Sequence, residues 1–70
     1  TVEEVQALYS DVGQRLDALD QADHPDIESL KTRYFSVPFV RALSDPALRP
    51  SVKEQLGRLA REARRASETP

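Results

Sequence analysis

The stretch SVPFVRALSDPALRP, from Ser36 to Pro50, decides how this chain folds, because it interrupts a sequence that otherwise reads as amphipathic helix. It contains three of the five prolines. Pro38 has no amide hydrogen to donate and disfavours helical geometry at Val37. We therefore predict that a helix coming from the N-terminal side breaks near Ser36, and that Ser36 caps a short helical piece over residues 37–43.

N-terminal to this break, the sequence predicts a first helix over residues 2–20. Thr1 and Glu4 have the spacing of a capping box. Gly13 costs about 1 kcal/mol of helix propensity, and we expect it to permit the close approach of another helix. The apolar residues repeat at a 3-4 spacing that is typical of a heptad seam: Val2, Val5, Tyr9, Val12, Leu16 and Leu19.

The middle helix is predicted over residues 24–44, broken near Ser36. Asp23 is expected to cap it, because aspartate accepts hydrogen bonds from free amides at a helix start. Pro25 is tolerated in a first helical turn. The apolar face then continues through Ile27, Leu30 and Tyr34.

The third helix is predicted over residues 51–66. Pro46 and Pro50 frame a tight connection before it, with one turn at residues 47–48. Ser51 and Glu54 form a second capping-box pattern. The apolar residues of this helix taper from large to small along a second heptad-like seam: Val52, Leu56, Leu59, Ala63 and Ala66.

These elements predict an all-α fold, a small three-helix bundle with a proline-broken middle helix, in a single domain over residues 1–66. Residues 67–70 are expected to form a frayed polar tail. A chain of 70 residues buries only about 60% of its unfolded surface, and no cysteine is present to reinforce it. The core therefore supplies ~3–5 kcal/mol, so its helices must pack well or a partner must complete it.

The net charge of −2 conceals an uneven distribution. Residues 1–30 carry eight acids and one base, and residues 31–70 carry nine bases and four acids. We interpret this asymmetry first as attraction within the fold, since parallel outer helices would place Asp17 and Asp20 beside Arg61, Arg64 and Arg65. The alternative is a surface for nucleic acid or an acidic partner.

No residue pattern indicates catalysis, a cofactor or a metal site. His24 lies in a predicted turn, and the aspartates around it lack the spacing of a calcium loop. The two glycines are too far apart for a phosphate-binding loop, and no cysteine is present. No apolar run approaches the ~18 residues of a membrane span. We therefore expect a soluble, cytoplasmic protein that is not an enzyme.

The function predicted is non-catalytic protein–protein interaction, as a regulatory, adaptor or chaperone-like subunit or as an interaction domain. The candidate anchors gather at the proline-rich break: Phe35, Phe39, Val40 and Leu43. They form either a plug over the end of a thin bundle or a rigid anchor for a partner's groove. The two heptad seams also allow association with another chain or with a second copy.

The alternative function is nucleic-acid binding through the basic face of the third helix, at Arg58, Arg61 and Arg65. Arginines on one helix face can neutralise phosphates. However, no aromatic residues are interleaved with them to stack on bases, and the chain is acidic overall.

Overall fold

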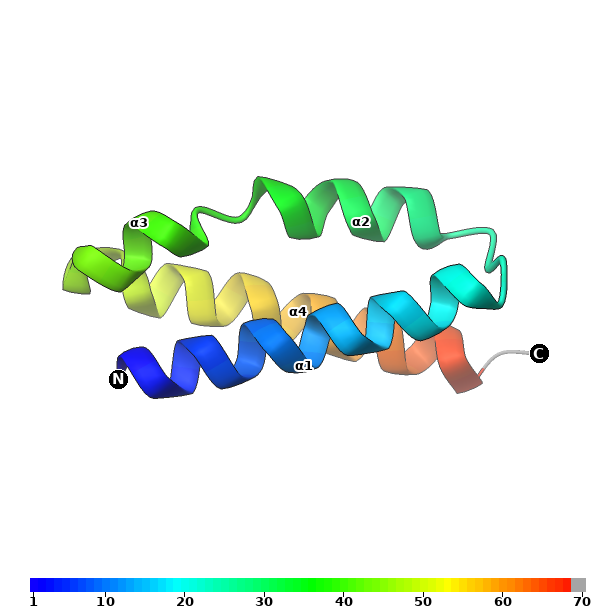
Figure 1. Cartoon of the computed structure of the whole chain (residues 1–70), viewed down its shortest axis with the longest axis horizontal. Coiled ribbons are helices and arrows are strands. Elements are labelled where there is room, and N and C mark those ends of the chain that lie inside the picture. The colour runs from blue at the N-terminus through cyan, green and yellow to red at the C-terminus, as the bar shows by residue number, and fades with distance from the viewer. Residues whose placement is uncertain (69–70) are drawn as a thin grey trace.

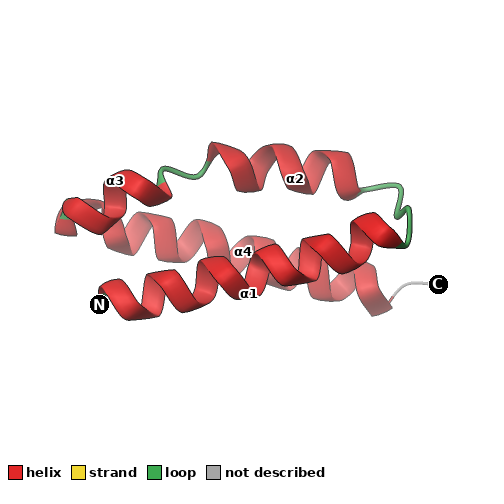
Figure 2. Cartoon of the chain, in the orientation of Figure 1, coloured by secondary structure: helices red, strands yellow, loops and turns green. Residues whose placement is uncertain are grey.

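The protein, described here by a computed structural model over residues 1–68, is a bundle of helices without a strand in that range (Figures 1 and 2). The bundle measures 38 × 17 × 15 Å. Its elements are α1 (Val2–Gln21), α2 (Ile27–Ser36), α3 (Phe39–Ser44), a 3-10 turn η1 (Pro46–Leu48) and α4 (Arg49–Glu68). Because α2 and α3 together form a bent middle helix, the predicted three-helix bundle is confirmed.

The outer helices α1 and α4 run in the same direction, and the middle helix returns across both of them (Figure 1). The contact between α1 and α4 is the most extensive in the molecule, while α2 contacts each of them less. Two helices whose heptad seams face each other along their length explain this ranking.

The core is built from the two predicted seams and the inner face of the middle helix. Val2 and Tyr9, at the edge of the first seam, are half-buried rather than fully buried. Within residues 1–68 no polar or charged residue is buried. The buried apolar residues are Val5, Val12, Leu16, Leu19, Ile27, Leu30, Tyr34, Val37, Ala42, Val52, Leu56, Leu59 and Ala63.

The loop after α1 differs from the prediction, because Asp23 ends α1 rather than capping the next helix. Asp23 has a φ of 54°, in the left-handed region. Its amide donates to the carbonyl of Asp20, and the amide of His24 donates to that of Leu19, both at 3.1 Å. This hydrogen-bond pair is a Schellman motif, which normally places glycine at the left-handed position but tolerates a short polar residue. Consequently α2 begins only at Ile27.

The break in the middle helix lies where Pro38 predicted it, but the predicted cap is wrong. Ser36 is the last residue of α2, and its hydroxyl donates to the carbonyl of Arg33 at 2.8 Å. Val37 is extended, with φ −66° and ψ 129°, as expected for a residue before proline. The short helix α3 starts at Phe39 without a side-chain cap.

The start of α4 also differs, since it begins at Arg49 instead of Ser51. The cap lies earlier in the chain, where the carboxylate of Asp45 accepts from the amide of Ala47 at 3.0 Å and orders η1. This turn at residues 47–48 was predicted, and it leads into α4 without an interruption. Because Ser51 lies inside α4 and not before its first residue, it is not the helix cap that was predicted.

Arg49 closes the other side of this connection. Its guanidinium donates to the carbonyls of Ala42 and Leu43, both at 3.1 Å. These carbonyls lie in the last turn of α3, where they lack helical amide partners. At its far end α4 reaches Glu68, two residues past the predicted end, and residues 69–70 of the predicted tail lie outside the described range.

Tyr34 holds α2 against α1. Its hydroxyl donates to the carbonyl of Tyr9 at 3.0 Å, and burial together with this bond raises the pKa of the phenol. The hydroxyl therefore stays a donor. A Cβ at Gly13 would lie 2.7 Å from the Tyr34 hydroxyl oxygen, and Cβ atoms in proteins essentially never come within 3.0 Å of such a neighbour. Gly13 thus makes room for the tip of the Tyr34 side chain of α2, rather than for the backbone of another helix.

We expect Gly13→Ala to lower the free energy of unfolding by about 0–2 kcal/mol, because displacing Tyr34 costs about 1–3 kcal/mol and alanine regains about 1 kcal/mol of helix propensity. Gly57→Ala is the matched control, since a Cβ there meets nothing within 4 Å. That change should stabilise the helix by about 1 kcal/mol. Urea unfolding followed by far-UV circular dichroism measures both, and a similar gain for the two variants would contradict this account of Gly13.

Candidate functional site

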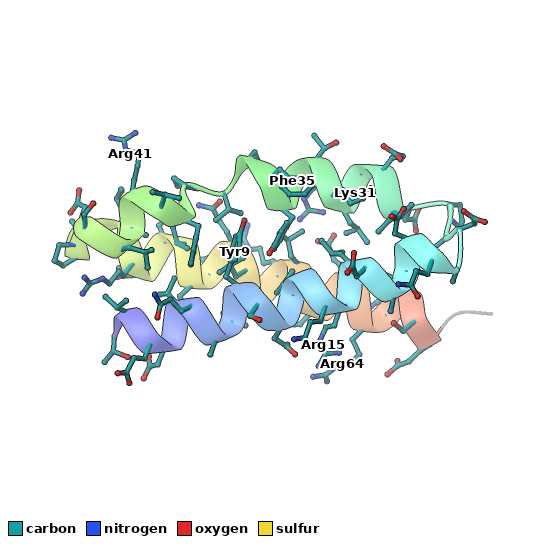
Figure 3. The ribbon with its side chains drawn as sticks, in the orientation of Figure 1. Tyr9, Arg15, Lys31, Phe35, Arg41 and Arg64 are labelled. Atoms are coloured by element: carbon teal, nitrogen blue, oxygen red, sulfur yellow. The ribbon has the colours of Figure 1, made fainter. Side chains whose placement is uncertain are left out.

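Four aromatic rings connect α1 to both halves of the middle helix, and Figure 3 labels two of them, Tyr9 and Phe35. Phe39 of α3 stacks on Tyr9 of α1 with ring centroids 3.9 Å apart, and Tyr9 stacks on Tyr34 of α2 at 4.5 Å. Phe35 meets the edge of Tyr34 at 5.3 Å. Aromatic pairs of this kind add ~0.5–1.5 kcal/mol each beyond their buried area. The rings therefore fix both sides of the Pro38 break to one helix.

The four candidate anchors at this break, Phe35, Phe39, Val40 and Leu43, are called here the apolar corner. The structure divides them. Phe39 and Leu43 are half-buried against the bundle, in keeping with the plug interpretation. In contrast, Phe35 is 71% exposed and Val40 is 75% exposed. The corner is therefore part core and part surface, and only its outer pair is accessible to a partner.

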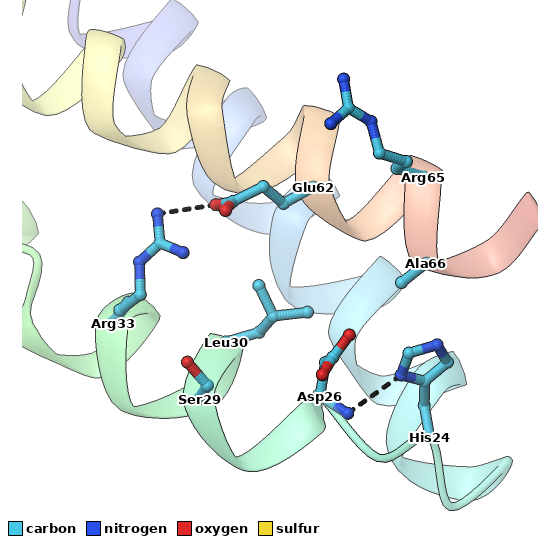
Figure 4. Close-up of a pocket in the computed structure, with 8 residues that line it drawn as sticks. All are labelled: His24, Asp26, Ser29, Leu30, Arg33, Glu62, Arg65 and Ala66. Carbon is cyan, nitrogen blue, oxygen red and sulfur yellow. Dashed lines mark hydrogen bonds and ion pairs between the residues drawn. The ribbon is translucent and has the colours of Figure 1, made fainter. Parts of the chain in front are cut away.

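The predicted basic residues of α4 lie on the side of that helix that borders α2. Arg58, Arg61 and Arg65 line a shallow cavity of about 210 Å³ together with Arg33 of α2 and with Glu62. We call these five residues the arginine surface. An adjoining cavity of about 310 Å³ continues toward the end of the bundle, where Leu30 and Ala66 contribute its apolar part (Figure 4). The taper of α4 to alanine leaves this space.

Acidic side chains neutralise part of the arginine surface. Arg33 and Glu62 form an ion pair at 2.6 Å, and Arg58 and Glu54 form another at 2.7 Å (Figure 4 shows the first). The Arg33 guanidinium lowers the pKa of Glu62, and the carboxylate raises the pKa of Arg33 in return. Arg33 and Arg58 are thus already paired with acidic side chains within the protein.

The predicted attraction of Asp17 and Asp20 to Arg61 and Arg64 does not lead to ion pairs over residues 1–68. Asp20 pairs with Lys31 of α2 at 3.6 Å, because the middle helix packs beside the end of α1.

An ion pair joins α1 and α4 near their N-terminal ends, far from Asp17 and Asp20. Lys53 of α4 lies 3.1 Å from the carboxylate of Glu4, which also belongs to the confirmed capping box with Thr1. Lys53 and the N-terminal amine lower the pKa of Glu4. The charged residues therefore fix the starts of α1 and α4 side by side.

His24 takes part in the loop between α1 and α2. Its Nδ1 accepts from the amide of Asp26 at 3.1 Å, so the ring stabilises the turn. Among the residues that the structure describes, no three histidine, aspartate or glutamate side chains come close enough together to hold a metal ion. None of the helices described is both long and apolar enough to cross a membrane.

Arg33 and Glu62 were not predicted as site residues, although both belong to the arginine surface. Their pairing depends on how far α2 is shifted along α4, and the apolar spacing within each helix does not set that shift. Tyr34 was recognised as part of an apolar face, but its hydrogen bond to Tyr9 was not.

Comparison of the chain with protein-family models, with curated proteins and with solved structures found no match. Any assignment of function therefore depends on the chain's own surfaces, the apolar corner and the arginine surface.

The Arg33–Glu62 pair predicts a pH dependence of stability. A glutamate whose pKa is lowered by folding stabilises the protein above its ordinary value of 4.5, and this contribution is lost as the pH falls through the lowered value. Because both side chains are 45% exposed, the pair contributes about 0–1 kcal/mol.

We expect Glu62→Gln to reduce stability at neutral pH by at most about 1 kcal/mol, with the difference from wild type vanishing well below pH 4.5. Asp17→Asn is the control, since Asp17 forms no ion pair over residues 1–68. Urea unfolding at a series of pH values measures both. If Asp17→Asn lost more stability than Glu62→Gln, the result would support the predicted attraction between Asp17 and the arginines of α4.

Proposed function

We propose that this protein is a non-catalytic protein–protein interaction module, and that the apolar corner is its contact surface. The observation that carries the proposal is the exposure of Phe35 and Val40, at 71% and 75%. Isolated apolar residues are common on protein surfaces. Two large ones on either side of a proline break, braced by stacked rings, have the character of a binding anchor.

Rigidity supports this assignment. Phe35 lies against Tyr34, whose hydroxyl is bound to α1, and Val40 follows Phe39, which stacks on Tyr9. An anchor that is already ordered loses little conformational freedom when it binds, so more of the contact energy remains as affinity. The proposal includes a cytoplasmic location, as expected from the cysteine-free sequence.

The heptad seams are not needed for this function. Most large residues of both seams are buried inside a single chain, for example Val12 at 0% and Leu56 at 0% exposure. A partner would have to open the bundle in order to use them. The proposal therefore places the contact on the outer side of the middle helix, away from the α1–α4 seam.

The test is the double variant Phe35→Ser with Val40→Ser, and Ala7→Ser with Ala18→Ser is its control on the exposed side of α1. Both should unfold within about 2 kcal/mol of wild type, because the first loses the edge contact of Phe35 with Tyr34 and the second loses the helix propensity of two alanines. Partner retention on the immobilised chain should fall at least about tenfold for the first variant only. Equal retention by the two variants would refute the proposed surface. Phe39→Ala is unsuitable, because Phe39 stacks on Tyr9 at 3.9 Å and its loss would weaken the fold.

A second candidate is nucleic-acid binding through the arginine surface. The observation that favours it is the convergence of Arg33 with three arginines of α4 around one shallow cavity. Such a cluster is suited to phosphate oxygens, since each guanidinium offers a planar pair of donors. It ranks second because acidic side chains already pair with Arg33 and Arg58.

This second candidate is tested by fluorescence anisotropy with a single-stranded RNA and a duplex DNA. If it holds, affinity should fall steeply with salt, with a log–log slope of about −0.7 to −0.9 for each phosphate contacted. Replacing Arg58, Arg61 and Arg65 by glutamine should abolish the binding, while Arg15→Gln on α1 should leave it unchanged. Dissociation constants weaker than about 10⁻⁴ M for both nucleic acids would exclude this function.

A further inference from the structure

The apolar corner lies in a strongly basic part of an acidic protein. Residues 31–44 contain three basic residues and no acidic residue, although the chain has a net charge of −2. Arg33 is directed toward Glu62 of α4, which leaves Lys31 and Arg41 beside the exposed pair. Lys31 lies one helical turn before Phe35, and Arg41 is next to Val40.

Arg41 is the more available of these two charges. Its side chain extends away from the bundle (Figure 3), and its guanidinium forms no ion pair or hydrogen bond with residues 1–68. Lys31 pairs with Asp20 at a distance of 3.6 Å, and about a third of its side chain, 35%, remains exposed. Each exposed apolar residue therefore has one basic residue near it in its own helix: Lys31, which is paired with Asp20, precedes Phe35 by one turn, and Arg41 follows Val40.

The positive charge of Lys31 and Arg41 disfavours a second copy of the chain as the partner of the apolar corner. In a two-fold symmetric contact the same patch meets itself, so Lys31 and Arg41 would face their own counterparts. An asymmetric contact with the acidic face of α1 has little to bury, because Phe35 and Val40 are the large apolar side chains exposed within residues 1–68. Arg33 and Arg65 line both cavities beside α4 and oppose a second copy's Lys31 and Arg41, although Glu62 also lines both cavities and Asp26 lines the larger one.

The size and shape of the exposed pair in the apolar corner also favour a different protein as its partner. Side chains that are 71% and 75% exposed project from the surface, so they fit a concave site. A phenylalanine buries about 150–250 Å². A stable interface needs about 800 Å² on each partner, so this pair is an anchor within a larger contact. Charges around such an anchor steer encounter and select the partner.

We infer that the apolar corner inserts Phe35 and Val40 into an apolar groove on a different protein, and that carboxylates on the rim of this groove face Lys31 and Arg41. The inference rests on the proposed function, because it specifies the partner of the same surface. It adds the partner's chemistry, which the proposed function leaves open.

The experiment uses the full chain carrying Thr32→p-benzoylphenylalanine, a photo-crosslinker at an exposed position of α2 next to the corner. The chain is irradiated in an extract of its source cells, and crosslinked peptides are identified by mass spectrometry. In this background, Lys31→Glu with Arg41→Glu reverses the rim charges, and Phe35→Ser with Val40→Ser removes the anchor. Arg61→Glu with Arg64→Glu changes the net charge equally on another face.

The inference expects adducts to a protein whose crosslinked site is an apolar groove rimmed by aspartate or glutamate. Their yield should fall at least about tenfold with both corner variants at low salt, and not with the Arg61/Arg64 control. At about 0.5 M salt, screening should remove most of the effect of charge reversal but not that of anchor removal.

The other outcomes separate this inference from the proposed function. Adducts lost with the anchor but unaffected by charge reversal would overturn the acidic rim and leave the interaction module standing. Adducts between two copies of the chain would overturn the choice of a different protein. Adducts retained by both corner variants, or no specific adduct at all, would overturn both proposals.

Discussion

The contact between Tyr34 and α1 is the constraint on which the rest of this small bundle depends. The Tyr34 hydroxyl reaches the carbonyl of Tyr9 because Gly13 leaves no Cβ in its path. Tyr34 thus supplies a hydrogen bond, a stacked ring and the spacing between α1 and α2. In a chain of 70 residues whose core has few large side chains, this arrangement sets where α2 lies and therefore where the middle helix breaks relative to α1.

The Pro38 break has two consequences for the surface. An uninterrupted amphipathic helix would keep its apolar residues on one face. The extended backbone at Val37 resets the helical phase, so that Phe39 turns inward onto Tyr9 while Val40 turns outward. The plug and anchor interpretations of the apolar corner are therefore complementary. The inner residues attach the middle helix to the bundle, and this attachment makes the outer pair rigid.

Much of the fold could be predicted from the sequence. The heptad seams and the Pro38 break follow from local periodicity and backbone chemistry. The helix ends were less predictable. Asp23 and Ser51 are residue types that favour helix starts, but Asp23 ends α1 in the left-handed conformation and Ser51 lies inside α4. Tertiary packing determines such choices between neighbouring polar residues. Of the candidate site, the sequence located the corner but could not separate Phe35 from Phe39, since that depends on the helical phase after the break.

The parallel course of α1 and α4 has a mechanical consequence. The start of α1 and the end of α4 lie at opposite ends of a body 38 Å long (Figure 1). A pulling force applied between these ends would act along both helix axes, so that α1 and α4 would have to slide past each other. Sliding loads the seam contacts from Val5 to Leu19 and from Val52 to Ala63 together, whereas a helical hairpin can be peeled apart one turn at a time. Forced unfolding is governed by the barrier to rupture. Under a force in this direction the seam contacts would share the load, while the outer side of the middle helix would stay accessible.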